Sequence, residues 1–135
     1  MNKDLRLSSA IHILIALYYV GVLDSNKLAM SLQTNPGLVR RLLAQLSKAK
    51  LIITEKGKGG GSRLAKDPRD ITIGSIYLAI GHNRVFKSFE KKPFEKCHVS
   101  CCIKNSLDSL YEDIEGAMFN RMQKITLSQM IKKIK

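Results

Sequence analysis

Apolar residues recur at helical spacing in several segments of the chain, which are separated by polar, glycine-containing or irregular segments. The first periodic segment, Leu5 to Gly21, is apolar around much of its circumference, which predicts a core helix. A shorter segment follows, beginning at a capping residue, Asp24 or Ser25. The next begins at Pro36, and proline is favoured at the first helical position because its missing N–H costs nothing there. The pattern therefore predicts three successive helices, the last two joined by a very short link.

The helix that begins at Pro36 has two different faces. One is apolar and consists of Val39, Leu42, Leu43 and Leu46, at intervals of three and four. The other consists of Gly37, Arg40, Arg41, Ala44, Gln45 and Lys48. A basic face at a helix start suits entry into the major groove of DNA, although an ordinary solvated surface helix shows the same pattern. The predicted contacts to base edges and phosphates are Gln33, Thr34 and Asn35, in the short link, with Arg40 and Arg41.

Segment 51–54 reads as a β-strand and segment 62–65 as a returning strand, and the glycine-rich run 57–61 between them predicts the turn of a β-hairpin. We interpret this hairpin as a wing beside the helix-turn-helix. Its predicted contacts to an A·T-rich minor groove are Lys56, Lys58 and Arg63, which supply charge, and Gly59 and Gly60, which permit close approach. A phosphate-binding loop fits poorly, because the run lacks the Gly-Lys-Ser/Thr ending and no helix follows it. A helix-turn-helix followed by a basic wing favours DNA binding far more than either piece alone.

The second half of the chain predicts a helix capped by Thr72, an irregular segment over 82–96, and a long helix from Ile103. This long helix cannot bury its apolar residues within a small winged domain, so we expect it to pair with the same helix of a second chain; packing only on its own first helix is the alternative. A last amphipathic helix covers 127–134. We divide the chain into a DNA-binding domain (1–81), a cysteine-bearing sensor loop (82–102), and a dimerisation helix with the C-terminal helix (103–135). The predicted dimer interface comprises Ile103, Leu107, Leu110, Ile114, Ala117, Met118 and Met122.

Charge points to a polyanionic partner. The 135 residues include 23 Lys and Arg against 11 Asp and Glu, which gives a formal net charge of +12. Nucleic acid is the first expectation, an anionic membrane surface the second and an acidic protein the third. Lys3 and Arg6, at the start of the first helix, are additional candidates for phosphate contact. The longest apolar run, Ile13 to Val22, is too short to span a membrane, and no signal peptide is evident, so we expect a cytoplasmic protein.

The residue types that commonly serve in catalysis are scattered along the sequence. The three histidines, His12, His82 and His98, have no triad, paired-carboxylate or metal-ligand partners in the pattern, so the sequence predicts neither an enzyme nor a metal site. We interpret His12 as structural. The alternative to a DNA-binding regulator is an RNA-binding or adaptor module that uses the same basic surface, and a salt-dependent preference for structured RNA over duplex DNA distinguishes the two.

Several segments together resemble the Rrf-two family of bacterial winged-helix transcription regulators, which includes the IscR, NsrR and CymR types. The likeness covers essentially the whole chain, in the order and spacing of its parts. The resemblance implies a homodimeric regulator that binds a palindromic operator and responds to a small-molecule or redox signal. The position matching Arg40 often carries another polar residue in the family, so the operator sequence does not carry over. The matching segments are Ser8–Leu14, Asn35–Leu43, Gly57–Ser62 and Asp70–Tyr77, followed by cysteines before a long helix.

The cysteines depart from the family pattern. Many members hold an iron–sulfur cluster through three well-separated cysteines, whereas here Cys97 is followed closely by the adjacent pair Cys101 and Cys102. Adjacent side chains are expected to diverge. The spacing therefore disfavours a cluster, which would need His98 or Glu95 as a substitute ligand.

Thiol chemistry is the other reading of the cysteine segment. If the segment is helical, Cys97 and Cys101 lie on one face and their sulfurs meet, or Cys101 meets its counterpart in a second chain. Lys96, His98 and a helix N-terminus favour the thiolate and hence oxidation. The alternatives are inert, buried thiols or small-ligand sensing. The three cysteines are thus candidates for redox sensing.

Taken together, the sequence predicts a mainly α fold with one small β-hairpin: a winged helix-turn-helix domain followed by a long dimerisation helix. The predicted function is a homodimeric repressor that occupies palindromic double-stranded DNA under redox- or ligand-responsive control. The cysteine segment is expected where the long helix meets the DNA-binding body, so that a change there alters the spacing of the two recognition helices.

Overall fold

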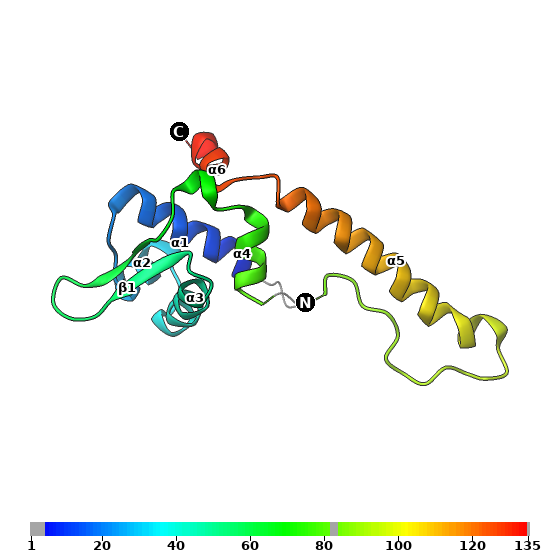
Figure 1. Ribbon diagram of the computed structural model, residues 1–135. Coiled ribbons are helices and arrows are strands. Elements are labelled where there is room, and N and C mark those ends of the chain that lie inside the picture. The colour runs from blue at the N-terminus through cyan, green and yellow to red at the C-terminus, as the bar shows by residue number, and fades with distance from the viewer. Residues whose placement is uncertain (1–4, 82–83, 135) are drawn as a thin grey trace. The chain divides into compact units, whose positions relative to one another are not determined.

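A computed structural model describes residues 5–81 and 84–134. Lys3 and His82, named above, lie outside these ranges, as do residues 1 and 135 at the two ends of the predicted domains. Six α-helices, one 3-10 turn and one antiparallel hairpin are described (Figure 1), which confirms the mainly α fold with a small β-hairpin. In chain order they are α1 (Arg6–Val20), α2 (Ser25–Leu32), α3 (Pro36–Lys48), β1 (Ile52–Glu55), β2 (Gly61–Leu64), η1 (Pro68–Asp70), α4 (Ile73–Ala79), α5 (His98–Met122) and α6 (Leu127–Ile134).

The described residues form two compact units. One comprises 5–81 and 122–134 and contains the helix-turn-helix, the hairpin and α6; the other comprises 84–121 and contains nearly all of α5 with the segment that precedes it. No helix in the described ranges is both long enough and apolar enough to cross a bilayer. Each unit is described below by itself.

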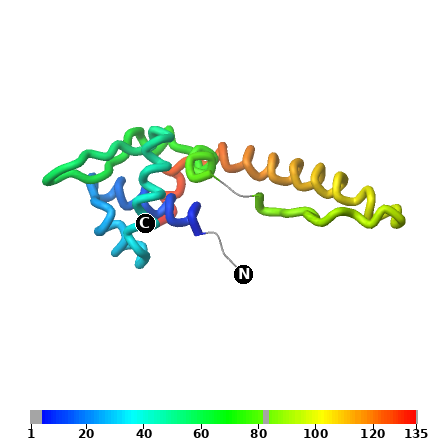
Figure 2. The backbone as a smooth tube through the Cα atoms, turned by 90° about the horizontal axis from the view of Figure 1, so that it is seen from below, coloured from blue at the N-terminus to red at the C-terminus, as the bar shows by residue number. Residues whose placement is uncertain are grey.

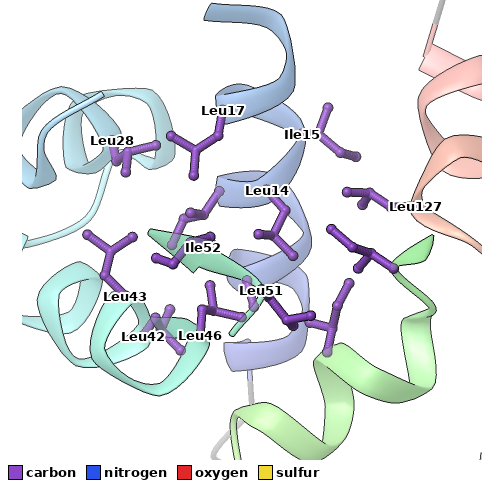
Figure 3. Close-up of a cluster of buried hydrophobic side chains, with 14 of the residues drawn as sticks. Leu14, Ile15, Leu17, Leu28, Leu42, Leu43, Leu46, Leu51, Ile52 and Leu127 are labelled. Carbon is purple, nitrogen blue, oxygen red and sulfur yellow. The ribbon is translucent and has the colours of Figure 1, made fainter. Parts of the chain in front are cut away.

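The core of the first unit surrounds α1. Leu14 and Leu17 are almost fully buried and face leucines of α2 and α3, while Ile15 on another side of α1 lies near Leu127 of α6 (Figure 3). The predicted apolar face of α3 is buried throughout, with Val39 and Leu46 both at 0 % exposure. Burial of a leucine or isoleucine side chain contributes on the order of 1.5–3 kcal/mol, so this cluster holds α3 in a fixed orientation.

Short side chains begin the helices where the sequence places them. The N–H of Lys27 donates to Asp24 Oδ1 over 2.8 Å, and the N–H of Leu38 donates to Asn35 Oδ1 over 2.8 Å. Thr72 and Ser75 form a reciprocal capping box at the start of α4. Each satisfies an N–H that has no partner in the first helical turn, worth about 1 kcal/mol per cap. The predicted starts of α2, α3 and α4 are therefore confirmed.

The hairpin is anchored to the helical body at its base. Its strands pair Ile52 with Leu64 and Glu55 with Gly61, and Ile52 is buried. Leu23, between α1 and α2, exchanges backbone hydrogen bonds with Ser62 over 3.1 and 2.8 Å. A Cβ on Gly61 would lie 2.7 Å from the Leu23 carbonyl oxygen, so only glycine permits this approach. The loop at the other end of the strands projects beyond the helices (Figure 1).

The chain returns after α5 to complete the first unit. The N–H of Ile73 donates to the Ile125 oxygen, and the N–H of Leu127 donates to the Ile71 oxygen, both over 2.8 Å. Leu127 and Ile131 of α6 are buried in the core around α1. Met122, assigned above to the dimer interface, is also partly buried against this core.

The second unit consists of α5 and an irregular segment that runs alongside it (Figure 2). Regular helix was predicted from Ile103, but α5 begins at His98. The physical reason is that Cys97 caps this start, because the N–H of Ser100 donates to Cys97 Sγ over 3.4 Å. The Ser100 hydroxyl in turn ties the preceding segment to the helix, by accepting the N–H of Phe94 over 2.9 Å. Cys101 and Cys102 consequently lie on the helix, whereas the sequence analysis placed them in a loop.

Polar contacts hold the segment to α5. The N–H groups of Val85 and Phe86 both donate to Glu115 Oε1, over 2.9 and 3.3 Å. The Phe86 ring stacks on Tyr111, with centroids 5.4 Å apart, and the Ser88 hydroxyl donates to Asp108. One face of α5 is therefore covered within the same chain.

Candidate nucleic-acid interface

The exposed face of α3 carries the two arginines that the sequence singled out. Arg40 and Arg41 are exposed, while Val39 and Leu42 beside them are buried. Since the burial of one face fixes the rotation of the helix, the guanidinium groups face solvent. Gln45 departs from the prediction: it was placed on the outer face, but it is half-buried and its Nε2 donates to the Ile80 oxygen over 3.2 Å. The basic surface is therefore narrower than the sequence pattern indicates.

The turn before α3 is held by its own hydrogen bonds. Gln33 adopts a left-handed conformation (φ 54°, ψ 47°), and the N–H of Thr34 donates to the Ala29 oxygen over 3.0 Å. Gln33 and Asn35 are exposed and Thr34 is half-buried. The Asn35 oxygen accepts the helix-capping bond, so this atom serves the fold and not a ligand.

The tip of the wing is shaped by glycines and carries basic side chains. Gly57 and Gly59 have φ values of 101° and 79°, which glycine adopts without strain. Gly60 closes the turn, because its N–H donates to the Gly57 oxygen over 3.0 Å. Lys56 and Lys58 are exposed.

Arg63 differs from the two wing lysines. It forms an exposed ion pair with Glu55 across the hairpin, with 3.3 Å between Nη2 and Oε1. Such a pair contributes at most ~1 kcal/mol in water, so a phosphate can compete for the arginine.

A groove of about 450 Å³ lies between α3 and the wing. Arg40 and Ala44 line it from the helix, and Thr54 and Gly60 line it from the hairpin. Arg41 lies outside this lining. Asp24 and Glu55 also line the groove, so its lining carries both signs of charge.

Two other polar residues named above have structural partners. His12 Nε2 lies 2.9 Å from the Ser31 hydroxyl and joins α1 to α2, as its structural interpretation requires. Arg6, a predicted phosphate contact, is half-buried, and its Nη1 donates to the Ile80 oxygen over 3.4 Å. This bond commits Arg6 in part to the junction of α1 with α4.

The cysteines lie at the start of α5: Cys97 directly precedes the helix, and Cys101 and Cys102 are its fourth and fifth residues. Cys97 is partly exposed and caps the helix with its sulfur, as described above, and it also lines a cavity of about 390 Å³ with Phe89 and Ile103. Lys91, Lys92 and Lys104 border the same cavity. An apolar space ringed by ammonium groups suits a small amphipathic anion.

The expectation that Cys101 and Cys102 diverge is wrong. Their sulfurs lie 3.0 Å apart, and the Cys101 thiol also lies 3.0 Å from the His98 carbonyl oxygen. Both cysteines are free and exposed. The physical reason is that side-chain rotation at the open start of a helix brings neighbouring sulfurs together although their Cα–Cβ bonds point apart.

The thiolate expectation also fails for Cys101. Its hydrogen bond with Cys102 raises the pKa of the Cys101 thiol above its ordinary value, and slight desolvation of the sulfur acts in the same direction. The raised pKa favours the protonated, less reactive form.

A histidine joins the cysteine pair. The ligand atoms of His98, Cys101 and Cys102 lie within 4.8 Å of one another, and all three residues are exposed. Sequence reasoning missed this group because it expected the adjacent cysteine side chains to diverge and began the regular helix at Ile103. The signal was the spacing i, i+3, i+4, which puts three side chains on one helical face once the helix begins at His98.

Comparison with known proteins gives a consistent result. The family model Rrf2, described as an iron-dependent transcriptional regulator, matches residues 4–133. A candidate HTH-type transcriptional regulator of Bacillus subtilis (strain 168), YwnA, is 34% identical over 126 residues, which are 93% of this chain and 94% of that protein. The regulator NsrR of Oceanobacillus iheyensis is 27% identical over 70% of this chain and 63% of its own length.

Solved structures show the same architecture. A crystal structure described as a candidate DNA-binding protein is 33% identical and superposes with a TM-score of 0.76, covering 93% of this chain and 98% of that one. The oxidised form of CymR from Staphylococcus aureus has the same fold at 18% identity, with a TM-score of 0.69 over 97% of this chain and 96% of its own. These relatives are regulators and not enzymes, which confirms the prediction that the chain is not an enzyme.

Proposed function

The chain belongs to the Rrf2 family of DNA-binding transcription regulators, and from this premise we propose that it is a homodimeric repressor that reads a palindromic operator with α3 and the wing. The single observation that carries the proposal is the exposed pair Arg40 and Arg41 on a helix whose opposite face is buried. Such a helix presents guanidinium groups to a major groove in a fixed orientation. One arginine paired with a guanine gives about 1–3 kcal/mol of discrimination against other bases.

The contacts divide into two kinds. Arg41, with Gln33 and the Asn35 amide group, is proposed to reach base edges, because these residues are exposed at the start of α3. Arg40 in the groove, and the wing residues Lys56, Lys58, Gly59, Gly60 and Arg63, are proposed to hold phosphates and the neighbouring minor groove.

Dimerisation is proposed through α5. No residue of this fully described helix is buried, and Leu110 and Ile114 are 48 % and 40 % exposed. The segment before α5 contacts positions 108, 111 and 115, which form a neighbouring face of the helix and leave the apolar stripe uncovered. A second copy of α5 would bury the stripe. Two chains related by a two-fold axis would then present two recognition helices to half-sites about 34–36 Å apart.

Signal control is proposed at the start of α5, through the thiols or through a small ligand in the cavity beside Cys97. Rrf2 members can bind iron–sulfur clusters. A cluster with two irons needs four ligands spread over both metals. The three converging donors here surround one point, and Cys97 Sγ instead accepts the N–H of Ser100. The residues present therefore do not fit such a cluster.

The operator is found by selecting bound duplexes from a random library with the full-length protein. The expected product is a palindrome with half-sites one helical turn apart. Duplex binding is then compared with binding to a structured RNA of equal length across a salt series. Tighter binding to the RNA at every salt concentration would favour the RNA-binding alternative and reject the operator.

Arg41→Ala tests the recognition helix on the selected operator. We expect weaker binding to the operator by about 1–3 kcal/mol and little change on random DNA, because the lost contact is to a base. Arg40→Ala should weaken both and reduce the salt slope by about 0.9, since it removes a phosphate contact. Lys133→Ala removes one exposed charge from α6 and is the control. Operator affinity that is equal in Arg41→Ala and the control would remove α3 from the interface.

A further inference from the structure

The group formed by His98, Cys101 and Cys102 has no part in the proposed DNA interface or in the apolar stripe. It occupies a single turn at the start of α5, and its ligand atoms lie within 4.8 Å of one another. At 100° per residue, these three positions lie on the side of α5 opposite to Ile103, Leu107 and Leu110. The segment before α5 contacts a third side, at Asp108, Tyr111 and Glu115. The group therefore stands open to solvent.

We propose that His98, Cys101 and Cys102 bind a single thiophilic metal ion, with Zn²⁺ as its representative, through one imidazole nitrogen and two thiolates. Thiolate sulfur selects soft ions such as Zn²⁺ and Cu⁺, and imidazole binds the same metals. On binding, two S–H bonds break, two metal–sulfur bonds form, and two protons leave to solvent. The two thiolate charges balance those of a divalent ion, so no buried counter-charge is needed.

The distances fit one ion. Zinc–sulfur bonds of about 2.3 Å place two thiolates about 3.8 Å apart on a tetrahedral centre. The two sulfurs lie 3.0 Å apart, so they separate by less than about 1 Å when an ion replaces their shared proton. Three protein ligands leave one position of the tetrahedron for water, and the exposure of all three residues supplies it.

Two rival uses of the pair are less compatible with the geometry. A disulfide between Cys101 and Cys102 requires Cα atoms at least about 4.4 Å apart, whereas consecutive Cα atoms are about 3.8 Å apart. A two-iron cluster requires a fourth ligand and a wider arrangement than three donors within 4.8 Å. A mononuclear site uses the donors where they already lie.

The test uses the reduced full-length protein and Zn²⁺ in competition with a chromophoric chelator. We expect one ion per chain. Removal of a direct ligand should weaken binding at least as much as loss of a second-shell partner, which costs about 10- to 100-fold. Cys101→Ser, Cys102→Ser and His98→Ala should each show this loss. Cys97→Ser is the matched control, because it removes a neighbouring thiol outside the group, and it should bind Zn²⁺ as the unchanged protein does.

Co²⁺ gives a second readout that does not depend on affinity. Bound Co²⁺ should show thiolate charge-transfer absorption, which each of Cys101→Ser and Cys102→Ser reduces and Cys97→Ser leaves in place. Half an ion per chain would mean a site bridging two chains and would overturn the proposal. Equal loss in Cys97→Ser would overturn it too, as would a stable coloured cluster formed with iron and sulfide that needs Cys97.

The result of the metal-binding test does not depend on whether the chain is the proposed DNA-binding repressor. Metal binding is measured on free protein, and circular dichroism of each variant verifies that α5 is retained. Operator binding of the same samples is measured separately, so a failure of either proposal leaves the other open to its own test.

Discussion

At the scale of single residues, Asn35 lies where folding and DNA binding meet. Its side-chain oxygen accepts the Leu38 N–H over 2.8 Å and begins α3, and the residue is also exposed at the proposed interface. A loss of DNA affinity on mutation is therefore ambiguous unless the cap is preserved.

We predict that Asn35→Ala lowers the free energy of unfolding by about 1 kcal/mol, whereas Asn35→Ser, which keeps a capping oxygen, changes it little. Urea denaturation measures both. If Asn35 also contacts a base through its amide group, both variants lose operator affinity although only one is destabilised. Equal unfolding free energies for the two variants would contradict the capping role.

Gly60 and Gly116 allow the same substitution, glycine to alanine, to be compared at a crowded and at an open position. A Cβ at Gly60 would lie 2.3 Å from the Glu55 oxygen and 2.9 Å from the Gly57 oxygen, so Gly60→Ala must open the wing turn. At Gly116 in α5 nothing lies within 4 Å, and alanine there favours the helix by up to about 1 kcal/mol.

We therefore predict opposite signs for the two substitutions. Gly60→Ala should lower the unfolding temperature and weaken DNA binding, while Gly116→Ala should raise the unfolding temperature and leave DNA binding unchanged. Thermal unfolding and gel shifts measure the two effects. If Gly60→Ala binds the operator as tightly as the unchanged protein does, the wing tip is not among the DNA contacts.

At the scale of elements, the sequence predicts best where the signals are local. The starts of α2, α3 and α4 follow from Asp24, Asn35 and Thr72, because a cap depends only on residues within one turn. The hairpin is predicted from the glycines of its turn, which are also a local signal. Its anchoring to Leu23 is a long-range contact that no local pattern contains.

The start of α5 was mispredicted because its cap is unusual. The Cys97 sulfur accepts the N–H of Ser100, the third residue of α5, and sulfur is a weak acceptor that ordinary capping rules omit. Because the predicted start, Ile103, lies five residues after the observed start, His98, the sequence did not predict that His98 and two cysteines lie close together. Gln45 was misplaced for a related reason: its bond to the Ile80 oxygen depends on how α4 packs against α3, which periodicity does not show.

We expect the stability of the contact between α5 and the segment before it to depend on pH through Asp108. The hydrogen bond from Ser88, and then that from Lys104, lower the pKa of the Asp108 carboxyl below its ordinary value. Because the folded pKa lies below that of the unfolded chain, ionised Asp108 stabilises the fold above the unfolded value of about 3.9. This contribution is lost as the pH falls through the lower, folded pKa.

We predict that Asp108→Asn destabilises the protein near neutral pH and that the difference from the unchanged protein shrinks as the pH falls toward 3. The effect is small, because the Asp108 side chain is 30% exposed and water screens its charge. Urea unfolding at a series of pH values measures it. A difference that stays constant over this range would show that the charge of Asp108 has no role in holding the segment.

At the scale of the whole molecule, the net charge and the exposed apolar stripe point to different partners. The charge of +12 makes association with DNA strongly dependent on salt but carries no sequence information. Specificity requires two recognition helices at a fixed separation, and a stable dimer provides that separation. In the proposed dimer, the stripe on α5 would therefore matter to operator choice as much as the arginines of α3.

We predict that Leu110→Glu converts the proposed dimer to a monomer, because it places a charge in the centre of the stripe, where a second α5 would bury it. Light scattering should show half the mass, and binding to a full palindrome should fall to the affinity of one half-site. Ser109→Glu adds the same charge at an exposed position outside the stripe and should remain dimeric. Because Leu110 is already 48 % exposed in the single chain, its substitution removes little from the chain's own core. A dimeric Leu110→Glu protein would therefore exclude the α5 stripe as the interface and would require another surface to set the separation of the recognition helices.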